Sequence, residues 1–190
     1  MWGDRIELAG AELYWSPQFL TDPARWLEQL LVELPWQQRS IRMFGRDLPE
    51  PRLTSWHGDP GASYRYSGQT NEPLPWTPVL QRMRQRLAEI GVPSNSVLAN
   101  LYRDGADHMG WHADDERGLG PVIASVSLGS ARTMQFRPRP KGPVALRIEL
   151  LSGSLLVMAG ATQRNVHHRI PATRTQVGPR VNLTFRTITS

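Results

Sequence analysis

The sequence predicts a mainly β fold with N-terminal α/β elements, and two observations support this fold class. From about residue 96 the chain breaks into short runs rich in β-branched and aromatic residues, which turn residues separate. Before that point, two segments repeat apolar residues at helical spacing. The 190 residues suit a single domain without a linker, so we expect residues 1–95 to pack on a β-rich core formed by residues 96–190.

Each of the two predicted helices has a polar residue before a proline at its start. Asp22 is expected to cap a helix over residues 23–34, whose leucines recur on one face. Thr77 is expected to cap a second helix over residues 78–90. The residues between the helices, 35–76, are rich in proline and glycine, and we expect them to be irregular.

The second half of the chain contains seven runs with the composition and length of strands. No helical pattern separates them, so we expect them to close into an all-β body. The runs are residues 97–102, 122–128, 133–137, 144–150, 154–158, 166–170 and 180–187.

Positive charge is concentrated in this second half. Residues 1–99 carry 10 arginines against 11 acids, whereas residues 100–190 carry 12 basic residues against 6 acids. All the basic residues except Lys141 are arginines, which suit bidentate contacts with phosphate and carboxylate groups. The asymmetry favours an anionic partner, with nucleic acid first, and an arginine-rich genome composition is the alternative explanation.

The sequence offers no sign of export or membrane insertion. It has no cysteine, it begins without an apolar signal core, and none of its apolar runs approaches the ~18 residues of a spanning helix. We therefore expect a soluble, cytoplasmic protein, and we expect it to be a monomer.

A candidate metal site begins at His112-Ala113-Asp114. In an extended segment the two polar side chains point the same way and can bind one ion. A third ligand must come from a distant strand, and His167 and His168 are candidates that lie on opposite faces of any strand. Two histidines and one carboxylate are the ligand set of non-haem Fe(II) oxygenases, although a lone His-X-Asp triplet is also common by chance.

The last predicted strand has a polar face that suits a pocket. Arg180, Asn182 and Arg186 alternate with apolar residues and therefore share one side. Burying two unpaired guanidiniums is costly unless an anion meets them, and a dicarboxylate would do so at both ends. The alternative is an edge strand with solvated arginines. Asn100 and Tyr102 likewise share a face, from which they could donate hydrogen bonds to a carboxylate.

Together these segments resemble the AlkB family of Fe(II)- and 2-oxoglutarate-dependent nucleic-acid dealkylases, and most of all the branch that contains the second and third human AlkB homologues. The match is nearly continuous over the second half of the chain. The matching stretches are NLY (100–102), HADDE (112–116), IASVSLG (123–129), GSLL (153–156), GATQ (160–163), HRIP (168–171) and PRVNLTFR (179–186), with YRYSG (64–68) and PW (75–76) upstream.

The resemblance implies a fold and a reaction. The fold would be a double-stranded β-helix, or jelly roll, carrying N-terminal helices and a nucleotide-recognition lid. The reaction would repair N-alkylated bases of the 1-methyladenine and 3-methylcytosine type in DNA, with RNA as a further target. The reaction would use Fe(II) as the metal, consume O2 and 2-oxoglutarate, and release formaldehyde, succinate and CO2. The alternatives are a hydroxylase or demethylase of RNA, protein or a small molecule on the same fold, and a non-catalytic nucleic-acid binding module.

The resemblance also implies roles for individual residues. The iron ligands would be His112, Asp114 and His168. The contacts of 2-oxoglutarate would be Asn100, Tyr102, Arg180, Asn182 and Arg186. The contacts of the extruded base would be Tyr64, Tyr66, Asp115 and Glu116, with Phe44 as an apolar wedge in the duplex. We also expect a basic run to follow phosphates, formed by Arg132, Arg137, Arg139, Lys141 and Arg147.

Overall fold

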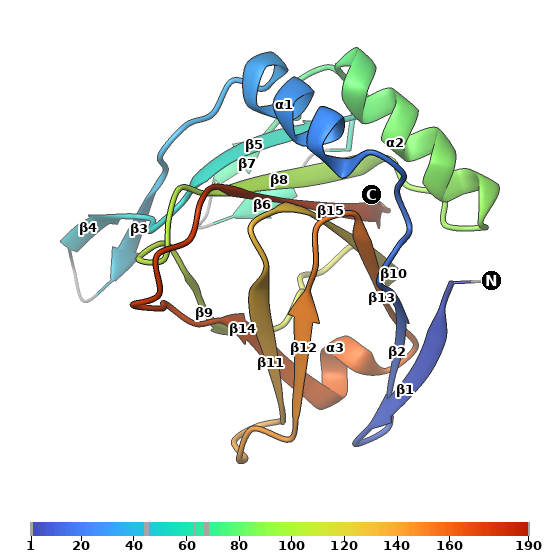
Figure 1. Cartoon of the computed structure of the whole chain (residues 1–190), viewed down its shortest axis with the longest axis vertical. Coiled ribbons are helices and arrows are strands. Elements are labelled where there is room, and N and C mark those ends of the chain that lie inside the picture. The colour runs from blue at the N-terminus through green and yellow to red at the C-terminus, as the bar shows by residue number, and fades with distance from the viewer. Residues whose placement is uncertain (1, 44–45, 63, 67–68, 190) are drawn as a thin grey trace.

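Figure 1 shows the computed structural model of the chain, which describes residues 2–43, 46–62, 64–66 and 69–189. Two antiparallel sheets face each other, and two helices lie on the outer side of the larger sheet. The predicted mainly β jelly-roll fold with N-terminal helices is therefore confirmed.

The larger sheet mixes strands from both halves of the chain. N-terminal strands form both of its edges, while strands from the second half fill its centre. In spatial order the strands are β1 (Asp4–Leu8), β2 (Ala11–Ser16), β13 (Ser154–Ala159), β10 (Leu119–Gly129), β15 (Arg180–Ile188), β8 (Ser96–Tyr102) and β5 (Leu53–Gly58).

The smaller sheet closes the other side of the body. Its strands, in spatial order, are β12 (Leu146–Leu150), β11 (Arg132–Pro138), β14 (Val166–Ile170) and β9 (Met109–His112). A one-turn helix, α3 (Thr162–Asn165), leads into β14. Two short hairpins lie outside the two sheets, β3 (Ser40–Met43) with β4 (Arg46–Pro49), and β6 (Tyr64–Tyr66) with β7 (Gln69–Asn71).

The helices α1 (Pro23–Glu33) and α2 (Pro78–Glu89) occur where the sequence predicts them. Asp22 caps α1 as expected, since its carboxylate accepts a hydrogen bond from the Arg25 amide at 3.4 Å. Thr77 occupies the N-cap position of α2, but within the described part of the chain its hydroxyl makes no capping hydrogen bond. The predicted position was right and the predicted cap was wrong.

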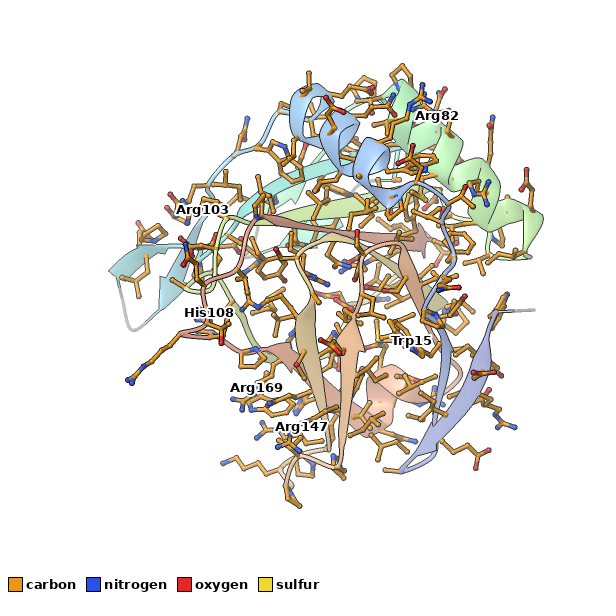
Figure 2. The ribbon with its side chains drawn as sticks, in the orientation of Figure 1. Trp15, Arg82, Arg103, His108, Arg147 and Arg169 are labelled. Carbon is orange, nitrogen blue, oxygen red and sulfur yellow. The ribbon has the colours of Figure 1, made fainter. Side chains whose placement is uncertain are left out.

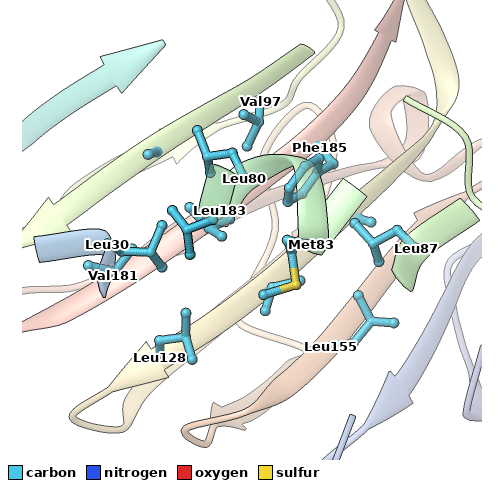
Figure 3. Packing of buried hydrophobic residues seen from close by; sticks show 14 of the residues in the cluster. Leu30, Leu80, Met83, Leu87, Val97, Leu128, Leu155, Val181, Leu183 and Phe185 are labelled. Atoms are coloured by element: carbon cyan, nitrogen blue, oxygen red, sulfur yellow. The ribbon is translucent and has the colours of Figure 1, made fainter. Parts of the chain in front are cut away.

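One apolar core lies between the helices and the larger sheet. In α2, Leu80, Met83 and Leu87 are fully buried. Figure 3 shows them over residues of the sheet that include Val97 of β8 and Phe185 of β15. A second apolar cluster, which includes Phe136 and Leu156, fills the space between the two sheets. Within the described residues, each helix is too short or too polar to cross a membrane.

The prediction of an irregular segment over residues 35–76 was wrong, because five strands lie in it. The most important is β5, which pairs with β8 and places Thr54 opposite Asn100. Five of its six residues are buried, so both faces are covered and the alternation that reveals a strand is missing. The strands β1, β2 and β9 were also missed.

Candidate active site

The three predicted metal ligands lie together between the sheets. One nitrogen from His112, one oxygen from Asp114 and one nitrogen from His168 are all within 4.8 Å of one another. His112 ends β9 and is paired directly with His168 of β14, with the ring centroids 4.2 Å apart. His167 is not part of this group. It lies on the other face of β14, where it is paired with Arg137.

Both imidazoles are suited to bind a metal ion. Burial lowers the pKa of His168 to about 3, so the ring is neutral near pH 7. Nδ1 of His112 lies 2.9 Å from the carbonyl oxygen of Gly110. A carbonyl only accepts, so Nδ1 donates the proton and the lone pair of a neutral ring is on Nε2. Nδ1 of His168 is buried and has no hydrogen-bond partner among the described residues.

Asp114 is held as a carboxylate by a neighbouring guanidinium. Burial alone would raise its pKa, but the positive charge of Arg186 holds the pKa of the carboxyl below its usual value. Nη2 of Arg186 donates to Asp114 Oδ1 at 2.8 Å. The backbone amide of Asp114 donates to Oε1 of Gln163 in α3 at 2.9 Å. Gln163 was given no role by the sequence, although it lies in a stretch that carries the resemblance.

A small cavity extends from the histidines and Asp114 into the space between the sheets. It brings together four of the five predicted co-substrate contacts, Asn100, Tyr102, Asn182 and Arg186. The remaining lining residues are mainly apolar or hydroxyl-bearing, including Leu98, Met134, Ile170 and Thr184. A cavity of this kind admits a small polar molecule that also reaches the metal ligands.

Arg180 lies buried beyond Tyr102 with most of its hydrogen-bonding capacity unused. Its side chain is 1% exposed, and its guanidinium carbon is 5.1 Å from the centroid of the Tyr102 ring. Nη2 donates to the hydroxyl of Ser127 at 2.9 Å, whereas Nε and Nη1 have no partner among the described residues. Burial lowers the pKa of Arg180 to about 10. Such a cation needs an anion beside it.

The expectation of two unpaired guanidiniums was therefore right for Arg180 and wrong for Arg186, which is paired with Asp114. The alternative of solvated arginines on an edge strand was wrong, because β15 lies between β10 and β8. Asn182 is held by the neighbouring strand β10. Its amide donates to the Ser125 hydroxyl at 2.7 Å and to the Val126 carbonyl at 3.2 Å.

A larger cavity opens from the same metal ligands toward the surface. His112, Asp114 and Arg186 line its inner end. Its outer walls come largely from β5 and the residues just before it, with Glu50, Arg52, Thr54 and Trp56, and from Glu116 on the opposite side. The sequence did not predict Glu50, Arg52 or Trp56, because it gave no indication that β5 lies beside the site.

The predicted base contacts fall in three different situations. Glu116 lines the larger cavity, while Asp115 is half-exposed and forms an ion pair with Arg139 at 2.6 Å. Tyr64 and Tyr66 belong to β6, and their side chains lie outside the described part of the structure. Phe44 lies outside the described residues. The roles of the two tyrosines and the wedge remain predictions.

The expected basic run is not a single surface. Arg132 is buried and donates to the backbone carbonyls of Asp104, Asp107 and Pro171. Its place in a phosphate-binding run was therefore wrong. Arg137 and Arg169 both stack on the Trp111 ring, with guanidinium carbons 4.3 and 4.5 Å from its centroid. Figure 2 shows Arg169 and Arg147 on the same side of the molecule, near the smaller sheet.

The fold agrees with comparisons to known proteins. A model of the 2OG-Fe(II) oxygenase superfamily matches residues 12–186. The mouse DNA oxidative demethylase ALKBH2 is 42% identical over 174 residues, which are 86% of this chain and 73% of the relative. The chain belongs to the AlkB family of 2OG-Fe(II) oxygenases. The resemblance recognised in the sequence is thus confirmed.

Other members of the AlkB family are also similar to the chain. The human alpha-ketoglutarate-dependent dioxygenase alkB homolog 3 is 44% identical over 174 residues, which are 85% of this chain. The chain spans 60% of the length of that relative. The solved structure of OsALKBH1 superposes with a TM-score of 0.62 at 18% identity, covering 92% of this chain and 97% of that one. This last likeness bears on the fold alone.

The donor set fits the metal and co-substrate of the family. Two imidazoles and one carboxylate provide a ligand set that leaves coordination positions open. The buried, incompletely paired guanidinium of Arg180 lies beside Tyr102 of the smaller cavity and would supply a cation for a carboxylate. A dicarboxylate that reaches both the metal and Arg180 would satisfy both ends of the site.

Proposed function

We propose that this chain is an Fe(II)- and 2-oxoglutarate-dependent oxidative demethylase of N-alkylated bases in DNA. The single observation that carries the proposal is that one small cavity is lined by His112, Asp114 and His168 and also by Tyr102, behind whose ring the buried guanidinium of Arg180 lies. The identity of 42–44% to the relatives named above supports the substrate class. One of those relatives is named a DNA oxidative demethylase.

The side chains that line the two cavities have different roles. His112, Asp114 and His168 would hold Fe(II), which supplies the chemistry that uses O2 and 2-oxoglutarate to oxidise the alkyl group. Arg180 would bind the distal carboxylate of 2-oxoglutarate. Asn100 and Tyr102 would donate hydrogen bonds to the same co-substrate. Arg186 would keep Asp114 deprotonated and oriented. These residues would hold the co-substrate in the smaller cavity, which would leave the larger cavity for the alkylated base.

The overall reaction balances with these components. Of the two atoms of O2, one enters succinate as 2-oxoglutarate loses CO2, and the other is inserted into a C–H bond of the N-methyl group. The hydroxymethyl group then leaves as formaldehyde and restores the base. A base in a stacked duplex cannot reach a metal between two sheets, so the enzyme must extrude the base or act on single strands.

A base methylated at its pairing edge is favoured for two reasons. Methylation at that edge weakens pairing, so a few kcal/mol less is needed for extrusion. It also leaves the base cationic, and the larger cavity is lined by Glu116 and the Trp56 ring, whereas its other glutamate, Glu50, is paired with Arg52. Opposite charge and aromatic faces both attract a cation.

The proposal is tested by following a methylated oligonucleotide by mass spectrometry and formaldehyde release in parallel. The wild-type protein with Fe(II), 2-oxoglutarate and O2 should remove the methyl group of 1-methyladenine in DNA, and His112→Ala should not. Circular dichroism should show that the variant is folded. Turnover that persists in the variant contradicts the assigned site.

The same assay decides among the alternative substrates. Matched RNA oligonucleotides and methylated peptides, tested at equal concentration, distinguish RNA or protein demethylation from DNA repair. Succinate formation excludes a non-catalytic binding module.

We also propose that the protein acts as a cytoplasmic monomer. Light scattering on the purified protein checks the monomeric state, and imaging of a tagged copy in its own cell checks the location.

A further inference from the structure

A buried chain of polar contacts joins the two cavities without passing through the metal ligands. Nε of Arg52 donates to Oδ1 of Asn100 at 2.9 Å, and Nη2 of Arg52 lies 3.2 Å from Oε2 of Glu50. Arg52 is 8% exposed, and Glu50 and Asn100 are each 3% exposed. Glu50 and Arg52 line the larger cavity, whereas Asn100 lines the smaller one.

The register of two strands brings these side chains together. β5 pairs with β8 so that Thr54 lies opposite Asn100. Arg52 lies in a bend just before β5, two residues before Thr54. From there its long side chain reaches Asn100, which the pairing of β5 with β8 places nearby.

The chemistry of this contact determines which way the Asn100 amide faces. A guanidinium can only donate, so Asn100 must present its oxygen to Arg52. Its NH2 group then lies on the other side of the planar amide and is left for the smaller cavity. If the amide were reversed, its NH2 would face the guanidinium, and its oxygen would face any carboxylate in the cavity. Both of those contacts would be repulsive.

Glu50 in turn holds Arg52. A guanidinium that is 8% exposed needs a compensating charge, and the Glu50 carboxylate supplies it at 3.2 Å. Nη2 of Arg52 is close to Glu50 Oε2 without making a hydrogen bond to it, while Nε donates to Asn100. The ion pair and the hydrogen bond together restrict how the planar guanidinium can turn.

We propose that Arg52 is a positioning residue for 2-oxoglutarate, which acts by orienting the Asn100 amide and is itself held by Glu50. Neither Glu50 nor Arg52 contacts the co-substrate in this arrangement. The inference rests on the proposed function, in which 2-oxoglutarate occupies the smaller cavity. It assigns a co-substrate role to two residues of the wall that would face the base.

The test measures 2-oxoglutarate binding by calorimetry to protein loaded with Mn(II), so that no turnover or nucleic acid is involved. Removing Arg52 alone would leave Glu50 as an uncompensated buried charge, so the pair is replaced together as E50Q/R52M. This variant should bind 2-oxoglutarate about fivefold to tenfold more weakly, the effect of one lost hydrogen bond. In turnover assays KM for 2-oxoglutarate should rise by a similar factor while kcat changes less.

A double-mutant comparison separates positioning from a general structural effect. N100A should weaken binding by a similar factor, and E50Q/R52M/N100A should bind no more weakly than N100A, because Arg52 acts through Asn100. R39M is the matched control. Arg39 is another arginine of the larger cavity, and its replacement should leave the affinity for 2-oxoglutarate unchanged.

Three outcomes would overturn the proposal. The first is unchanged 2-oxoglutarate binding by E50Q/R52M. The second is a triple variant whose loss of affinity equals the product of the losses in E50Q/R52M and N100A. The third is a loss of affinity in R39M equal to that in E50Q/R52M. If E50Q/R52M does not fold by circular dichroism, R52K replaces it. A lysine keeps the charge beside Glu50 but cannot also donate to Asn100 in the same fork geometry, so binding should still weaken, and unchanged binding would reject the idea. Failure of the wild-type protein to bind 2-oxoglutarate would instead overturn the proposed function, and this inference with it.

Discussion

Replacing Arg180 with methionine should abolish tight 2-oxoglutarate binding and, at the same time, stabilise the ligand-free protein. Burial lowers the pKa of Arg180 from 12.5 to about 10. At ~1.4 kcal/mol for each pH unit, the fold disfavours the charged side chain by about 3 kcal/mol when no anion is present. Methionine fills a similar volume without charge. Substitutions of this kind at buried charges are often stabilising by ~1–4 kcal/mol.

The assay is thermal unfolding by circular dichroism, with and without 2-oxoglutarate, on Mn(II)-loaded protein. A gain of ~1–3 kcal/mol should raise the Tm of the ligand-free variant by several degrees, since ~1 kcal/mol shifts a domain of this size by about 2–4 °C. The co-substrate should raise the Tm of the wild-type protein but not that of Arg180→Met. By calorimetry, Kd should rise at least ~30-fold, which corresponds to a loss of ~2 kcal/mol or more.

Two results would refute this reasoning about Arg180. If the ligand-free variant unfolds several degrees below the wild-type protein, the charge is already compensated by the fold. If the variant binds 2-oxoglutarate with unchanged affinity, Arg180 does not meet its distal carboxylate. Arg180→Lys serves as the control, because it keeps the charge but not the planar fork and should retain part of the affinity.

Three further predictions concern the metal ligands and the core. Gln163→Ala removes the acceptor for the Asp114 amide and should weaken metal binding about 10–100-fold in a Mn(II) titration, so unchanged affinity would contradict this role. The pKa of His168 is about 3 in the fold and 6.5 in the unfolded chain, so the unfolded state takes up the proton first as pH falls. The free energy of unfolding of the metal-free protein should therefore fall, through this group, by about 1.4 kcal/mol for each pH unit below 6.5. Urea titrations at pH 7 and pH 5 measure this fall, and His168→Gln should remove it. Met83→Ala should lower the free energy of unfolding by ~2–5 kcal/mol, and a loss below ~1 kcal/mol would show that the α2 contact can relax.

The strand pattern of the second half could be predicted because one face of most strands is polar. In β15 the alternation of Arg180, Asn182 and Arg186 with apolar residues correctly indicated a polar face directed into the body. The same periodicity fails where both faces are covered, as in β5, and where a strand has only four residues, as in β9. Period-two reasoning needs both a polar side and sufficient length.

The site was predictable where its residues are close in sequence or carry unusual chemistry. His112 and Asp114 are two residues apart, and Arg180 begins a polar face that alternates with apolar residues along its strand. Glu50 and Gln163 could not be identified in this way. Their roles depend on contacts with residues about 50 positions away, Asn100 through Arg52 in one case and Asp114 in the other. Such contacts exist only after the sheets have formed.

The direct pairing of His112 with His168 across β9 and β14 has a consequence for how the chain can vary in length. Inserting or deleting one residue within either strand would turn one imidazole to the opposite face and separate the pair. In the connection between β11 and β12, Arg139 is paired with Asp115 and donates to the carbonyl of Gln163, so we expect changes of length to be tolerated only beyond Arg139. In design terms, the metal centre is tied to the hydrogen-bond register, and the part of that connection beyond Arg139 is the place to graft a new recognition segment.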